Sequence, residues 1–80
     1  MSEDSIAYTV QGIGITAAQR DAGLAAMVGD FSKNNVASAM CRAGVPWDNW
    51  VADRAADRLL QTEKKAGRIY TISNRAWRKY

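Results

Sequence analysis

Basic side chains gather in the last eighteen residues of this 80-residue chain, where they could bind a polyanion. Six lysines and arginines stand there against one acid, Glu63: Lys64, Lys65, Arg68, Arg75, Arg78 and Lys79. Clustered positive charge on one element is typical of a protein that binds nucleic acid. The alternative is a basic tail that only aids solubility. We favour an ordered basic ribbon because the charges alternate with Ile69, Tyr70, Ile72 and Trp77.

The segment 48–66 carries a second set of bases and has the apolar periodicity of an amphipathic helix. At about 100° per residue, its apolar side chains fall within one half of the helix: Val51, Ala52, Ala55, Ala56, Leu59 and Leu60. Its charged side chains divide between two edges, with bases on one and acids on the other: Arg54, Arg58 and Lys65 against Asp53 and Asp57. A column of like charges slightly destabilises an isolated helix, so an anion lying against it would explain the pattern. The alternative is a solvated face on which Arg54 pairs with Asp57.

Trp50 projects away from the apolar half of this helix, near the helix start. An exposed tryptophan usually contacts another part of its own chain, here the N-terminal segment at Tyr8. The alternative is contact with a partner, either nucleic acid or protein.

The rest of the chain predicts an extended arm, two more helices and a hairpin. Residues 1–15 alternate apolar and polar side chains and then reach Gly12-Ile13-Gly14, which predicts an arm with one strand at most. Thr16 and Gln19 have the spacing of a capping box, which predicts a helix from residue 17 to about Asp30, with Val28 among its inward side chains. Gly23 in this helix suggests a close helix–helix approach. The remaining elements are expected as a helix over 34–43 that stops at Gly44, strands over 69–72 and 76–80, and a turn over 73–75.

Composition excludes several function classes. The chain has no histidine and one cysteine, so neither a zinc site, a Cys–His pair nor an intrachain disulfide is expected. No cofactor motif is present, because Gly12-Ile13-Gly14 lacks the third glycine and the context of a dinucleotide site. We therefore expect a protein that is not an enzyme. A lone cysteine and an acidic start without a signal-peptide pattern indicate the cytoplasm, and no apolar run is long enough to span a membrane.

The run AADRLLQTEKKAGRIYTISNRAWRKY carries a resemblance to a known class of domain. Its leucine pair, basic residues, Ala-Gly step and apolar strand resemble the junction of recognition helix and wing in winged helix-turn-helix proteins. The resemblance covers residues 16–80 and implies an α+β fold: three helices followed by a two-stranded wing, with residues 1–15 as an extended N-terminal arm. The short first strand of such a fold is expected between the second and third helices, near Val45, where little room is left for it.

The resemblance implies a small DNA-binding protein, a transcriptional regulator or accessory factor of a bacterium or mobile element. Helix 48–66 would enter the major groove of double-stranded DNA, and the wing 68–80 would lie on the backbone. The helix contacts implied are Asn49, Trp50, Arg54, Arg58, Gln61 and Lys65, and the wing contacts are Arg68, Arg75, Arg78 and Lys79.

Carboxylates on the presumed recognition helix leave a second function open. Asp48, Asp53 and Asp57 would repel phosphates, so the same fold could instead be a protein interaction module that uses Trp50, Asp53 and Asp57. A homodimer that pairs the arm at residues 6–10 as an edge strand would be compatible with either function.

Overall fold

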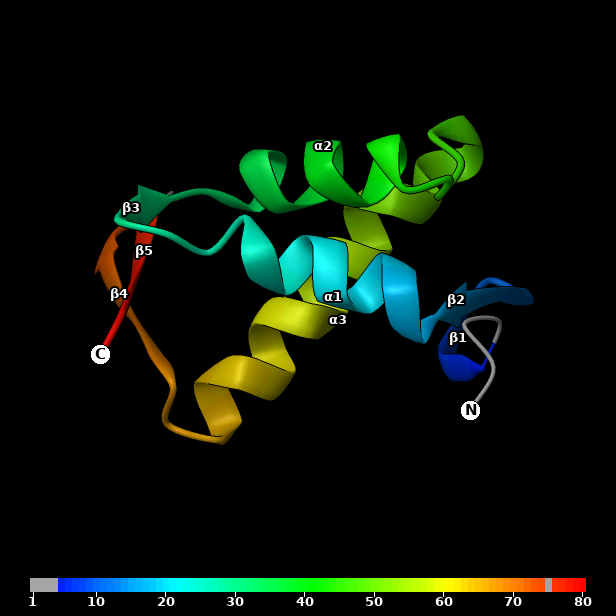
Figure 1. The fold of residues 1–80 in the computed structure, drawn as a ribbon. Coiled ribbons are helices and arrows are strands. Elements are labelled where there is room, and N and C mark those ends of the chain that lie inside the picture. Colours follow the sequence, from blue (N-terminus) through cyan, green and yellow to red (C-terminus); the bar gives the residue numbers. More distant parts are fainter. Residues whose placement is uncertain (1–4, 75) are drawn as a thin grey trace.

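The computed structural model describes residues 5–74 and 76–80, which form an α+β domain with three α-helices and two small antiparallel sheets. Arg75, one of the expected wing contacts, lies outside the described residues. The two sheets lie at opposite ends of the helices (Figure 1). None of the helices formed by the described residues has the length and apolar character that a bilayer-spanning helix requires.

The N-terminal segment is a hairpin instead of the expected extended arm. Strands β1 (Ile6–Val10) and β2 (Ile13–Thr16) pair antiparallel through a two-residue turn. Both turn residues, Gln11 and Gly12, have positive φ, as a type I′ hairpin turn requires. The sequence did not predict β2, because the glycines around Ile13 looked like flexible chain. One edge of β1, which we expected to be free for dimer pairing, is therefore occupied by β2.

Helix α1 (Ala17–Ala25) begins where the sequence predicts but ends about five residues earlier. Its capping box is confirmed: the Thr16 hydroxyl accepts from the Gln19 amide, and the Gln19 side chain accepts from the Thr16 amide. The chain then turns at Gly29, whose φ of +56° ends any helical path toward Asp30. Val28, expected to face inward, is 69% exposed in that turn.

Gly23 does mark a close helix approach. A Cβ at this position would lie 2.8 Å from a Leu59 methyl and 3.0 Å from Met40 Cγ, so α1 contacts α2 and α3 where only glycine fits without displacing its neighbours. Helix α2 (Lys33–Arg42) begins one residue before the predicted start, because Ser32 and Asn35 form a second capping box. Gly44, with φ +109°, follows its end as predicted.

Helix α3 (Val51–Lys65) starts three residues later than expected, after the 3-10 turn η1 (Asp48–Trp50). Trp50 occupies the capping position of α3 and makes no side-chain cap. The amide of Ala52 instead donates to the Pro46 carbonyl at 3.0 Å, so backbone groups of the preceding turn satisfy the helix start. Asn49 and Trp50 are both left-handed, which breaks the helical path at this point.

A three-stranded sheet closes the C-terminal end, in the order β3-β5-β4. Strands β4 (Ile69–Ser73) and β5 (Ala76–Lys79) occupy the positions predicted for the hairpin. The short strand β3 (Asp30–Phe31) pairs with β5, and it lies between α1 and α2, so the position expected near Val45 was wrong. Val45 is instead buried in the core.

The core lies between the three helices, and buried side chains from the strands of both sheets complete it: Val10, Ile15, Phe31 and Ile69. Figure 1 shows the helices between the two sheets. Helix α3 contributes small buried side chains, Ala52, Ala55 and Ala56, and larger ones, Leu59 and Leu60. This buried face orients α3, so that its opposite face points to solvent. The outward face of α3 is where the candidate site lies.

Candidate nucleic-acid interface

The outward face of α3 carries a ridge of polar side chains. Arg54, Asp57 and Gln61 are exposed, and they lie opposite Ala52 and Leu59, which are 0% and 4% exposed. In the described part of the chain, neither Arg54 nor Asp57 takes part in an ion pair, so the pairing between these two that the alternative interpretation required is absent. We call Arg54, Asp57 and Gln61 the α3 ridge.

The N-terminal hairpin forms one flank of this ridge and holds Arg58. Its guanidinium donates to the Thr9 carbonyl at 2.9 Å and lies 5.4 Å from the centre of the Tyr8 ring. The Tyr8 hydroxyl in turn donates to the Ala55 carbonyl at 2.8 Å. These contacts fix Arg58 without neutralising its charge, because a carbonyl and a ring carry no formal negative charge.

The titration of Tyr8 reports whether the N-terminal hairpin is packed against α3. Burial raises the pKa of its phenol to about 12, although the nearby charges of Arg58 and Arg20 act in the opposite direction. The unfolded phenol ionises near pH 10, so the contribution of Tyr8 to stability is complete below pH 10 and is lost as the pH rises through about 12. We expect an ultraviolet titration to show one tyrosine with a pKa near 12. Tyr8→Phe should remove that step, and its persistence in the variant would contradict the docking.

The opposite flank of the α3 ridge is built from α2 and the C-terminal hairpin. Lys33 Nζ lies 3.3 Å from an Asp53 carboxylate oxygen, and this ion pair compensates one of the three carboxylates expected to repel phosphate. Lys64 Nζ lies 5.6 Å from the centre of the Trp77 ring on β5. Within the described residues Lys64 makes no ion pair, so its positive charge remains available on this flank.

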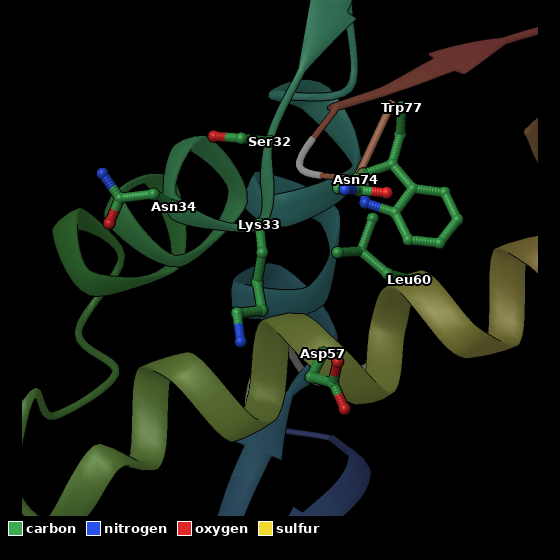
Figure 2. A pocket seen from close by; sticks show the side chains of 7 residues that line it. All are labelled: Ser32, Lys33, Asn34, Asp57, Leu60, Asn74 and Trp77. Carbon is green, nitrogen blue, oxygen red and sulfur yellow. The ribbon is translucent and has the colours of Figure 1, made fainter. Parts of the chain in front are cut away.

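A groove of about 460 Å³ runs between α3, the start of α2 and the C-terminal hairpin. Figure 2 shows Trp77 over Leu60, with Asn74 beside it, while Lys33 points toward α3 and Asn34 points away. Asp57 stands at the α3 side of this groove, and Ser32 at the α2 side. The tip of the hairpin therefore lies across a hollow from α3, so one extended ligand could contact both elements.

Two bases expected to contact DNA are ion-paired inside the domain. Arg68 donates to both oxygens of the nearly buried Glu63, at 2.9 and 2.7 Å, and so ties the end of α3 to β4. Arg78 donates to Asp30 at 2.7 Å and ties β5 to β3. Their charges are therefore partly compensated before any ligand arrives.

Other expected contacts remain open to solvent. Gln61, Lys65 and Lys79 are exposed, and neither lysine makes an ion pair with the described residues. Asn49 is also exposed, and its carbonyl accepts from the Gln11 side chain at 2.9 Å, which links η1 to the turn of the N-terminal hairpin.

Trp50 is 70% exposed, and Trp47 nearby is 53% exposed. Tyr8, which we expected beneath Trp50, is engaged with Ala55 and Arg58 instead. Trp50 has a φ of +63°, a conformation that is a genuine outlier for a bulky side chain and costs about 1–2 kcal/mol. The backbone thus holds an indole in solvent at the start of α3.

Lys33 and Lys64 were not among the predicted contacts. Lys64 belongs to the basic run at the C-terminal end of the sequence, and its position on the helix projection could have placed it beside the wing. Lys33 carries no comparable signal, because only the packing of α2 against α3 brings it to Asp53.

Comparison of the chain with protein-family models, with curated proteins and with solved structures gave no match. Among residues 5–74 and 76–80, no three cysteine or carboxylate side chains gather closely enough to hold a metal ion. Function must therefore be inferred from the geometry and charge of this surface.

Proposed function

We propose that this protein binds double-stranded DNA, with α3 in the major groove and the β4-β5 hairpin as a wing. The observation that carries the proposal is the outward face of α3, where a polar ridge lies between flanks that present bases. Arg58 and Lys65 stand on one flank, and Lys64 stands on the other. Charged flanks that meet phosphates, with polar side chains between them, match how a helix approaches base edges.

The arrangement of elements supports a winged-helix interpretation. The hairpin follows α3 directly after Gly67, whose φ of +75° ends the helix. Strand β3 extends the hairpin to three strands, and the Asp30–Arg78 ion pair holds it there. The hairpin is therefore anchored to the domain at a fixed angle, as a wing that positions DNA must be.

Dimensions also support this proposal. An α-helix with its side chains is about 10–12 Å wide, and the major groove of B-DNA is about 12 Å wide. From Arg54 to Lys65 the exposed face of α3 extends for about 16 Å along the axis. That length is enough for the ridge to pass several base pairs.

The role that fits a binding-only mechanism is a transcriptional regulator or accessory factor. Base contacts by the α3 ridge would select the site, and the flanking bases would supply affinity through phosphate neutralisation. Four exposed bases that make no ion pair with the described residues could neutralise phosphates: Arg58, Lys64 and Lys65 beside the ridge, and Lys79 on β5.

Fluorescence anisotropy of a labelled mixed-sequence duplex, titrated at several salt concentrations, tests the proposal. Four neutralised phosphates predict that the logarithm of the association constant falls with the logarithm of salt concentration with a slope of about −4. Absence of binding even at low salt would overturn the proposal.

The exposed tryptophans favour one rival function, a protein interaction module. Trp47 and Trp50 are large aromatic side chains in solvent, and such residues anchor protein interfaces. Asp53, assigned to this surface by the sequence, is already paired with Lys33, which weakens the acidic character of the patch. An aromatic-centred interface would change little between low and moderate salt, so the same titration separates the two functions.

A further inference from the structure

The α3 ridge places an arginine and an aspartate side by side where base edges would lie. Arg54 and Asp57 are three residues apart, which separates them by about 4.5 Å along the helix axis. Stacked base pairs are about 3.4 Å apart, so the two side chains can reach the same base pair or neighbouring pairs. Both are exposed, and no ion pair within the described residues engages either of them.

The carboxylate of Asp57 indicates which base edge α3 could contact. A carboxylate is repelled by phosphates, and at about 100° per residue Asp57 lies on the solvent-facing side of α3 between Gln61 and Lys64. Asp53, further toward the Lys64 flank, has its charge compensated by Lys33 at 3.3 Å. Asp57 is therefore the one carboxylate of α3 that makes no ion pair with the described residues, and it is exposed to a hydrogen-bond donor on a ligand.

We propose that Arg54 and Asp57 read a G·C base pair, or two adjacent ones, in the major groove. This inference rests on the proposed function and adds its sequence preference. Guanine presents two acceptors, O6 and N7, which the guanidinium of Arg54 can bind together. Cytosine presents the N4 amino group, a donor that the carboxylate of Asp57 accepts. An A·T pair lacks the paired O6 and N7 acceptors of guanine, so it cannot bind the Arg54 guanidinium with the same two hydrogen bonds.

Selection from a duplex library with a randomised core tests the assignment. The wild-type protein should enrich guanine at one position and cytosine at the same or the neighbouring base pair. Arg54→Ala should lose the guanine and bind the enriched duplex about 5- to 150-fold more weakly. Asp57→Asn should exchange cytosine for adenine, because an asparagine amide pairs with adenine N6 and N7.

Lys65→Gln is the matched control, because it removes a flanking charge on the same helix. It should weaken binding to every duplex and leave the enriched sequence unchanged. Salt-dependent binding by the wild-type protein without enriched guanine or cytosine, or an unchanged motif in Asp57→Asn, would overturn the assignment and leave duplex binding standing. Failure to bind any duplex at low salt would overturn both the assignment and the proposed function.

Discussion

Exchanging both Lys64 and Lys65 for glutamine is expected to weaken duplex binding about 50-fold at 0.1 M salt. The two lysines stand on opposite flanks of the α3 ridge, and each is assigned one phosphate. Each released counterion contributes about 0.9 to the salt slope, so the double variant should also flatten the slope by about 2. Anisotropy titrations at several salt concentrations measure both quantities.

The matched control lowers the net charge by the same amount away from the ridge. Arg42, the last residue of α2, is an exposed base that lies outside the α3 ridge and its flanks. Arg42→Glu should change affinity less than about threefold, because salt screens charges that lie more than about 10 Å apart. Equal losses in Arg42→Glu and in the double lysine variant would mean that binding depends on net charge alone.

The second large effect concerns stability. Replacing Glu63 with glutamine is expected to lower the free energy of unfolding by about 1–2 kcal/mol at pH 7, because it removes the charge from two hydrogen bonds with Arg68. The Glu63 side chain is only 7% exposed, while Arg68 is more than half exposed, so water screens part of the interaction and limits the effect. A loss of this size shifts the melting temperature by several degrees in a domain of this length.

The effect of Glu63→Gln should depend on pH. Hydrogen bonds from Arg68 hold the pKa of the Glu63 carboxyl below its usual range. The stabilisation is therefore fully present above the ordinary glutamate pKa of about 4.3, and it is lost as the pH falls through the lower folded value. Denaturation at pH 7 and near pH 2 should show a difference between wild type and variant that shrinks in acid.

Asp57→Asn provides the control for charge, since Asp57 is exposed and has no ion pair among the described residues. It should leave stability nearly unchanged at both pH values. A Glu63→Gln variant as stable as Asp57→Asn at pH 7 would show that the Glu63–Arg68 pair does not hold the hairpin to α3.

Local signals in the sequence predicted one helix start and two helix ends. The capping box at Thr16 and the stops at Gly44 and Gly67 each act within a few residues, so their consequences can be inferred from neighbours alone. The buried half of α3 also follows from periodicity, and every apolar residue assigned to it is buried.

Long-range pairing could not be inferred in the same way. Asp30 and Arg78 are 48 residues apart, and only the sheet brings them together. Strand β3 has two residues, too few for a periodic pattern, and the left-handed pair at Asn49 and Trp50 contains no glycine to reveal it. The candidate site was therefore predicted as a set of bases, while the structure decides which of them are compensated within the domain.

The position of β5 between β3 and β4 has a consequence for synthesis on the ribosome. Both neighbours emerge before it, and neither can complete its hydrogen bonding until residues 76–79 have left the exit tunnel. A ribosome that stalls before Ala76 would release a chain with two unpaired strand edges, the species most prone to join another copy.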